Sequence, residues 1–266
     1  MLVLLPPSET KRDGGSGGPL GVAAFAYPAL TASRLALVSA LGDLSGDTDA
    51  SIAALKLGPT QLAEIERNRE LETSPTMAAV DRYTGVLYDA LDAPSLSEAA
   101  RSFAGDHLQI HSALFGPVGA LDLIPAYRFS HDSKLPGLPL KKHWSSAIAG
   151  VLTETNGLVL DLRSEAYVHL GPAPRREDSV FLRVVTEAEN GQKRALNHFN
   201  KKSKGEFTRA LLQAERDFSN VAELLDWART AGFRLHHGAP GEVELVVEQL
   251  TIAQLAERSA SRRPLV

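Results

Sequence analysis

The chain contains no cysteine among its 266 residues. This absence excludes disulfide bonds, thiolate ligands for zinc and iron–sulfur clusters held by cysteine. No run approaches the roughly 18 uninterrupted apolar residues that a membrane-spanning helix needs. Residues 1–5 carry no basic region and are followed at once by polar residues, unlike a secretory signal peptide. We therefore expect a cytoplasmic protein with no membrane partner.

Several cofactor and metal signatures are also missing. The chain has no P-loop, no dinucleotide-binding glycine fingerprint and no His-Glu-x-x-His motif. The eight histidines are scattered, and the doublet His236-His237 would point its side chains to opposite faces of a strand. We expect neither a metal nor a cofactor, and the sequence indicates no protein partner.

The charge that is present is unevenly distributed. The formal net charge is −4, which argues against a protein that coats nucleic acid over its whole surface. Residues 190–216, however, hold seven Lys or Arg and two Glu, so their local charge is +5 and that of the remainder is about −9. Such a concentration of cations in an acidic protein indicates an anion-binding site.

Three lysines crowd into four positions of this stretch, at Lys201, Lys202 and Lys204. We expect a helix to begin near Phe207, and the unpaired N–H groups of a helix start add partial positive charge. Gly205 would let a ligand approach the backbone closely, and Asn200 would add a neutral hydrogen-bonding group. The stretch predicts a site for phosphate or carboxylate groups, with a solvated charged turn as the plain alternative.

The periodicity predicts a mixed α/β (α+β) fold, in which helices flank one mainly mixed sheet of a single domain. Helices are expected at residues 31–41, 49–57, 60–71, 75–90, 97–104, 142–155, 207–218 and 221–231. Strands are expected at residues 1–5, 158–162, 180–186, 193–199, 233–236 and 242–248. Asn190-Gly191 should form a tight hairpin turn. The glycine-rich residues 12–19 offer nothing to pack and predict a mobile loop, and residues 259–266 a frayed tail.

Polar clusters follow two of the expected strands. The first cluster comprises Ser8, Glu9, Thr10 and Lys11, and the second Arg163, Glu165 and Tyr167. The carboxyl ends of sheet strands commonly present functional groups, so both clusters are candidate sites. Arg128, in another turn, is a further cation that could reach an anion. An ordinary loop exit with a local cap, and a salt-bridged sheet edge, remain the alternatives.

The turn between residues 49–57 and 60–71 has the outline of a helix-hairpin-helix. Its turn residues are Leu57, Gly58, Pro59 and Thr60. In such elements the N–H groups of the turn and of the second helix start contact a DNA phosphate. The usual second turn glycine is absent here and the flanking charges are mixed, which favours a plain helical hairpin.

Several of these segments, in this order, resemble the YaaA-like peroxide stress proteins (the UPF0246 group) across nearly the whole chain. The matching elements are Pro6-Pro7-Ser8-Glu9-Thr10-Lys11, Tyr83-Thr84-Gly85, residues 111–116, Leu121-Asp122, Pro125-Ala126-Tyr127-Arg128, His143-Trp144, residues 161–167 and Lys201-Lys202-Ser203-Lys204-Gly205. Two departures are Glu9, where the family commonly has a turn lysine, and Phe115, where it has tyrosine. The chain is therefore similar to a divergent branch of the family.

The resemblance implies a cytosolic protein that limits oxidative damage during peroxide stress. It also implies a mixed α/β fold with a basic cleft, a helix-hairpin-helix element and sequence-independent binding of double-stranded DNA. The cleft would be lined by Lys201, Lys202, Lys204, Arg128, Arg163 and Lys11. The alternative is an enzyme that acts on a small phosphorylated or nucleotide-like molecule, with Glu9, Glu165 and Tyr167 as acid or base groups.

Overall fold

The computed structural model describes residues 1–187, 193–195 and 198–247. An eight-stranded sheet lies at the centre, in the order β4-β3-β1-β6-β7-β10-β9, and β8 pairs with β7. Its strands are β1 (Leu2–Leu5), β3 (Leu108–Ser112), β4 (Gly116–Gly119), β6 (Val159–Asp161), β7 (Ser179–Glu187), β8 (Lys193–Ala195), β9 (Arg234–His237) and β10 (Glu242–Val247). A separate two-stranded sheet joins β2 (Met77–Ala78) to β5 (Leu123–Ile124).

The N-terminal strand lies in the middle of the sheet. β1 is parallel to β3 on one side and to β6 on the other, so Leu4 is opposite both Gln109 and Asp161. All four residues of β1 are buried, as in parallel strands that are covered on both faces. The parallel order continues through β7 to β10, while β4, β8 and β9 pair antiparallel. The carboxyl ends of β1, β3 and β6 therefore meet at one edge.

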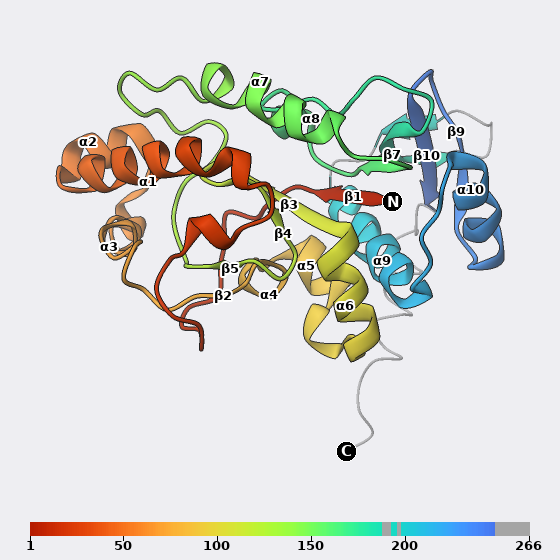
Figure 1. Ribbon diagram of the computed structural model, residues 1–266, viewed down its shortest axis with the longest axis horizontal. Coiled ribbons are helices and arrows are strands. Elements are labelled where there is room, and N and C mark those ends of the chain that lie inside the picture. The colour runs from red at the N-terminus through yellow and green to blue at the C-terminus, as the bar shows by residue number, and fades with distance from the viewer. Residues whose placement is uncertain (188–192, 196–197, 248–266) are drawn as a thin grey trace.

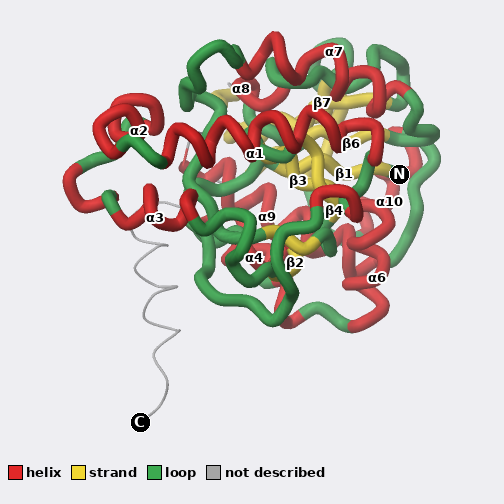
Figure 2. The backbone as a smooth tube through the Cα atoms, turned by 60° about the vertical axis from the view of Figure 1, so that its left-hand side comes forward, coloured by secondary structure: helices red, strands yellow, loops and turns green. Residues whose placement is uncertain are grey.

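Helices cover both faces of the sheet, which confirms the mixed α/β class (Figure 1). They are α1 (Thr31–Ser45), α2 (Thr48–Leu55), α3 (Ala63–Arg69), α4 (Ala79–Arg82), α5 (Val86–Leu91), α6 (Glu98–His107), α7 (Leu140–Thr153), α8 (Glu165–Val168), α9 (His198–Ala214) and α10 (Val221–Thr230). In Figure 1, α7 and α8 lie above the sheet and α5, α6 and α9 below it. α2 and α3 project to one side, and the turned view of Figure 2 shows the same projection.

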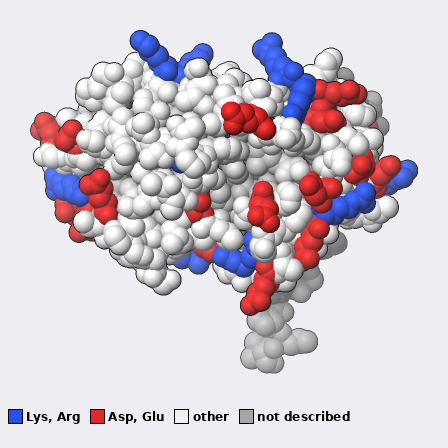
Figure 3. Space-filling view, viewed as in Figure 1, with Lys and Arg blue, Asp and Glu red and all other residues white. Residues whose placement is uncertain are grey.

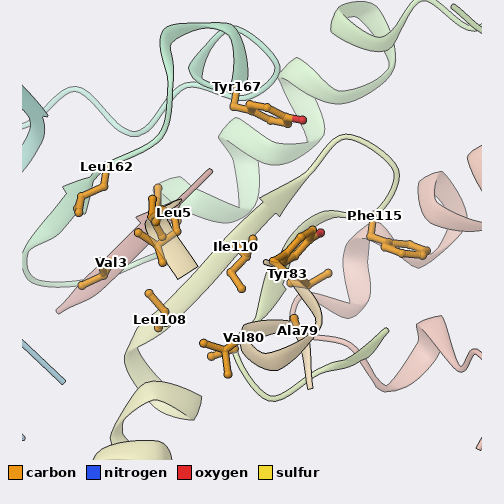
Figure 4. Packing of buried hydrophobic residues seen from close by; sticks show 14 of the residues in the cluster. Val3, Leu5, Ala79, Val80, Tyr83, Leu108, Ile110, Phe115, Leu162 and Tyr167 are labelled. Atoms are coloured by element: carbon orange, nitrogen blue, oxygen red, sulfur yellow. The ribbon is translucent and has the colours of Figure 1, made fainter. Parts of the chain in front are cut away.

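The core is continuous from the sheet into both helical layers. Val3 of β1 is opposite Leu108 of β3, and both are fully buried. Figure 4 shows Val80 of α4 below Leu108. Trp144 of α7 fills the other face, and its indole N–H donates to the carbonyl oxygen of Ala113 at 2.8 Å. Within the described residues, no helix is both long and apolar enough to cross a membrane.

The helix that carries the lysines begins earlier than the sequence pattern indicates. α9 starts at His198 rather than near Phe207, and β8 ends at Ala195 rather than at residue 199. Lysine and glutamate are good helix formers, so the polar residues before Phe207 can be part of the helix. Lys204 is buried along with Phe207 and Thr208, because a long side chain can bury its apolar stem at a core position. The lysines therefore belong to the helix, not to a loop before it.

The expected helix at residues 75–90 is instead broken into β2, α4 and α5. Tyr83 leaves α4 in an extended conformation, and Gly85 follows with φ of +97°. Side chains rarely adopt that conformation, so the glycine sets the break. The break turns Thr84 toward the loop after β1, where its backbone N–H donates to the carbonyl oxygen of Thr10 at 3.2 Å.

The glycine-rich residues 12–19 have more contacts than we expected. The Gly17 N–H donates to the carbonyl oxygen of Thr76, and the Arg12 N–H to that of Arg82. Backbone hydrogen bonds therefore tie this segment to Thr76 and Arg82, while its expected mobility stays a prediction. The Asn190-Gly191 turn and residues 259–266 lie outside the described residues, but the strands that flank the turn do pair antiparallel.

Candidate functional site

A pocket of about 530 Å³ lies at the carboxyl ends of β1 and β6. We call it the strand-end pocket. Its lining residues are Pro6, Pro7, Ser8, Glu9, Thr10, Thr84, Gly85, Val86, Leu87, Tyr88, Ser130, His131, Leu162, Ser164, Tyr167, Asn200, Lys201 and Lys204. The pocket thus brings together residues from both strand-end clusters and from the lysine-rich stretch, which lie far apart in the sequence. Parallel strands produce this convergence because their carboxyl ends share one edge.

Hydroxyl groups line the side of the pocket next to β1. Ser8 Oγ lies 3.3 Å from Thr10 Oγ1, which in turn accepts a hydrogen bond from Thr84 Oγ1 at 3.0 Å. The Tyr88 hydroxyl donates to the carbonyl oxygen of Pro6 at 2.8 Å and so ties α5 to the end of β1. Hydroxyls can donate as well as accept, which suits them to the oxygen atoms of a phosphate or sugar.

Two cations and an amide line the side formed by α9. Lys201 is exposed at this wall, whereas Lys204 is buried and donates to the carbonyl oxygens of Leu162 and Arg163 at 2.9 and 3.4 Å. Burial lowers the pKa of Lys204 to about 8. The buried Oδ1 of Asn200 accepts no hydrogen bond from the described residues. This wall can therefore offer positive charge and an unused acceptor to a ligand.

Lys202 and Gly205 do not line the pocket. Lys202 is exposed and lies 3.4 Å from Glu206, one helical turn further on. A Cβ placed on Gly205 would lie 2.1 Å from the carbonyl oxygen of Leu87 in α5. Gly205 therefore permits close packing of α9 on α5, not the approach of a ligand to a helix start.

Arg163 is a structural cation beside the pocket. Its side chain is fully buried and forms a two-point ion pair with Asp161, with N–O distances of 2.8 and 2.6 Å. Its Nη1 also donates to His111 Nδ1 at 2.6 Å. Burial and then this guanidinium hold the pKa of His111 well below its ordinary value. Arg163 thus fixes the turn after β6 and has no free face for a phosphate.

Arg128 and Glu165 do not line the pocket, and each is engaged in an ion pair. Arg128 contacts Glu9 at 2.9 Å, which gives Glu9 a cationic neighbour as it lines the pocket. Glu165 lies outside the lining and 3.5 Å from Arg183. Of the three acid or base candidates, Glu9 and Tyr167 line the pocket and Glu165 does not.

Lys11 lies beneath the loop that follows β1 rather than in the pocket. Its Nζ donates to the carbonyl oxygens of Ser8 and Glu9 at 3.1 and 3.2 Å and lies 4.0 Å from the centre of the Tyr127 ring. Burial, followed by the charge of Arg128, lowers the pKa of Lys11 to about 7. Lys11 therefore shapes the loop whose hydroxyls line the pocket.

The Lys11 pKa predicts a pH dependence of stability. Because the folded pKa is lowered below the unfolded value, the unfolded chain binds more protons between the two values, and stability rises with pH there. From pH 7 to pH 9, we expect the wild type to gain about 2 kcal/mol relative to Lys11→Met. Urea unfolding of both proteins at each pH measures this difference, and parallel pH profiles would contradict it.

Lining residues that were not identified as site residues from the sequence include Thr84, Ser130 and His131, whereas Tyr167 was one of the candidates. Tyr167 is buried, which raises its pKa, and its ring contacts the His131 ring edge-on at 5.3 Å. Ser130 and His131 follow the Pro125–Arg128 motif by a few residues, and Thr84 lies within the Tyr83-Thr84-Gly85 motif. The family motifs include or adjoin these residues, but the sequence around them did not indicate that they would lie next to the strand ends.

The hairpin at residues 57–60 lies outside this pocket. α2 ends at Leu55, a 3-10 turn spans Pro59–Gln61, and α3 follows. The Gly58 N–H already donates to Gln61 Oε1 at 2.9 Å. The turn residues Leu57, Gly58, Pro59 and Thr60 are not among the lining residues, and α2 and α3 project from the body in both views (Figures 1 and 2). A DNA-contacting role for this turn stays a prediction.

The surface charge is mixed. The face in Figure 3 shows Lys and Arg interspersed with Asp and Glu, without a continuous basic field. Across the part of the chain that the structure describes, no three His, Asp or Glu side chains are placed to hold a metal ion. This face therefore has no continuous basic surface along which a polyanion could bind.

Comparison with known proteins identifies the family of this chain. A family profile described as "Peroxide stress protein YaaA" matches residues 1–238. The chain belongs to this family. A UPF0246 protein of Corynebacterium glutamicum is 44% identical over 237 residues, which cover 87% of this chain and 93% of the relative. A UPF0246 protein of Streptomyces coelicolor is 40% identical over 246 residues, which cover 91% and 94%. The resemblance stated from the motifs is therefore confirmed.

The family match places the strand-end pocket within the region shared with the relatives. All of its lining residues lie between Pro6 and Lys204, inside the matched residues 1–238. The matched region also contains α9 and the central strands that position the pocket. The pocket is therefore formed entirely by residues inside the matched region.

Proposed function

We propose that the protein contributes to protection against peroxide stress by binding a small phosphate-bearing molecule in the strand-end pocket. The observation that carries this proposal is the convergence of Ser8, Thr10, Asn200, Lys201 and Lys204 on one cavity of about 530 Å³. Sites for small molecules commonly have volumes of about 300–1,000 Å³. Positive charge and several hydroxyls suit phosphate oxygens, and the apolar lining suits the rest of a nucleotide-like molecule.

Internal pairing of the cations favours a small ligand over an extended duplex. Lys11 and Lys204 donate to backbone carbonyls, and Arg163 and Arg128 contact Asp161 and Glu9. A duplex presents a row of phosphates, and its binding strength grows with the number of cations that can contact them. A single small anion needs few contacts, which the pocket supplies within one enclosure.

Binding of double-stranded DNA is the second candidate, and one observation favours it. Lys201 and Lys202 are adjacent in the sequence and exposed on α9, and Lys201 lines the pocket. Successive backbone phosphates of a duplex lying along α9 would contact these two lysines in turn. Such binding would be independent of sequence and strongly weakened by salt.

Substitutions of Lys201 and Lys202 distinguish a small phosphate-bearing ligand from duplex DNA. For a small ligand, we expect Lys201→Ala to weaken binding at least about tenfold, because a charge-assisted hydrogen bond contributes roughly 1.5–3 kcal/mol. The matched control is Lys202→Ala, which removes the same charge from the same helix outside the lining. It should change affinity by less than about twofold. The ligand is first found by a thermal-shift screen of inorganic phosphate, nucleotides and sugar phosphates, and calorimetry then gives the affinities.

Duplex DNA should respond differently to the same variants. If DNA is the ligand, Lys201→Ala and Lys202→Ala weaken binding similarly, and each reduces the salt slope by about one. Fluorescence anisotropy with a labelled duplex over a salt series measures this. No stabilisation by any phosphate compound, together with such DNA behaviour, would reverse our order of the two ligands.

A further inference from the structure

Lys204 differs from the other lysines whose side chains the structure describes. Lys11 and Lys204 are the two that are buried, and of these Lys204 alone lines the strand-end pocket. It is 5% exposed, and its amine lies 5.3 Å from the centre of the Phe181 ring. An amine in such surroundings has lost most of its hydration, which penalises its charged form.

The hydrogen bonds of Lys204 leave one position of its amine unused. A protonated lysine has three N–H donors, and two of them are directed at the carbonyl oxygens of Leu162 and Arg163. Both acceptors are neutral, so they stabilise the ammonium less than a carboxylate would. The third position is available to whatever occupies the pocket.

We propose that Lys204 binds its ligand covalently, through an imine formed between its ε-amine and the aldehyde or ketone carbon of a phosphate-bearing molecule. This inference rests on the proposed function, because it takes the strand-end pocket as the ligand site. Lys201 at the exposed wall would hold the phosphate while Lys204, deeper in the wall, meets the carbonyl carbon. Desolvated lysines in apolar pockets are the usual nucleophiles of this chemistry.

The reaction is balanced without an oxidant or reductant. The lone pair of the neutral amine attacks the carbonyl carbon and forms the C–N bond, while the C=O π electrons move to oxygen. That oxygen takes up the protons lost from nitrogen and leaves as water when the C=N bond forms. One amine and one carbonyl group therefore give one imine and one water.

The acid–base state of Lys204 suits this role. Burial lowers its pKa to about 8. Roughly one amine in ten is then neutral at pH 7, against about one in a few thousand for a lysine with an unperturbed pKa near 10.4. The buried amine is thus the more reactive one at neutral pH, although it is the less accessible.

Trapping of the imine tests the proposal. The full chain is incubated with pyridoxal 5′-phosphate below stoichiometric amounts, reduced with borohydride, digested and examined by mass spectrometry. We expect the reduced adduct on Lys204 to exceed that on Lys201 or Lys202 roughly tenfold. Lys204→Met should lose this dominant adduct, and Lys204→Arg serves as a second variant that keeps the charge. Adducts spread evenly over the exposed lysines would overturn the proposal.

A matched alcohol separates this inference from the proposed function. Pyridoxine 5′-phosphate carries the same phosphate and ring but an alcohol in place of the aldehyde, so it can bind only without a covalent bond. If it stabilises the protein against heat while neither pyridoxal 5′-phosphate nor glyceraldehyde 3-phosphate modifies Lys204, the covalent role is refuted and the pocket function stands. If no phosphate compound binds at all, the proposed function itself fails.

Discussion

Asp161→Ala is expected to lower the free energy of unfolding by about 3–5 kcal/mol. Asp161 is almost fully buried, and its carboxylate accepts the Nε and Nη2 hydrogen bonds of Arg163 as well as the Arg163 backbone N–H at 3.0 Å. Removal of the carboxylate leaves a guanidinium with no exposed surface and no counter-ion in contact. The cost is that of an uncompensated buried charge, which far exceeds that of a broken surface pair.

The same chain offers a matched control for this loss. Asp226 pairs with Arg229 at 3.1 Å on α10, and both side chains are more than three-quarters exposed. Asp226→Ala should cost less than about 1 kcal/mol. Chemical denaturation of the wild type and both variants gives the comparison. Equal small losses would mean that Arg163 is solvated when the protein is in solution.

The Asp161 pair also positions one wall of the pocket. It fixes the turn after β6, whose backbone carbonyls at Leu162 and Arg163 hold the Lys204 amine. Loss of the pair should therefore weaken ligand binding as well as folding. The ion pair that stabilises this turn therefore also sets the position of the Lys204 amine in the pocket.

The central strands and their functional edge were predictable from the sequence. The apolar runs at residues 1–5 and 158–162 indicate strands covered on both faces, and such strands are typical of parallel sheets. Parallel neighbours bring their carboxyl ends together, so the meeting of Ser8 with Ser164 follows from the two runs. This part of the site depends on local patterns and on a general rule of sheet geometry.

The roles of individual cations were not predictable in the same way. Whether a cation faces a ligand or a partner within the protein depends on contacts with distant segments, as Arg128 with Glu9 and Lys204 with Leu162 illustrate. Local sequence records charge but not the partner that neutralises it. The start of α9 was predicted too late for a related reason. The buried stem of Lys204 occupies a core position, but a hydrophobic pattern counts lysine as polar.

Gly205→Ala is expected to destabilise the protein by about 3 kcal/mol, although alanine is the better helix former by roughly 1 kcal/mol. The new Cβ would lie 2.1 Å from the Leu87 carbonyl oxygen and 2.9 Å from the Ala90 Cβ. A backbone atom cannot turn away as a flexible side chain can, so α5 and α9 must separate. α5 carries Val86 and Leu87 into the pocket lining, and the separation should therefore weaken ligand binding too.

Gly150→Ala is the control, because Gly150 lies within α7 and a Cβ there meets nothing within 4 Å. This change should leave stability unaltered or raise it by up to about 1 kcal/mol. Thermal and urea unfolding of the two variants then separate helix propensity from packing between helices. The sequence pattern assigned Gly205 to a ligand, whereas the structure assigns it to α5. A Gly205→Ala protein that keeps its stability but loses phosphate binding would restore the first interpretation.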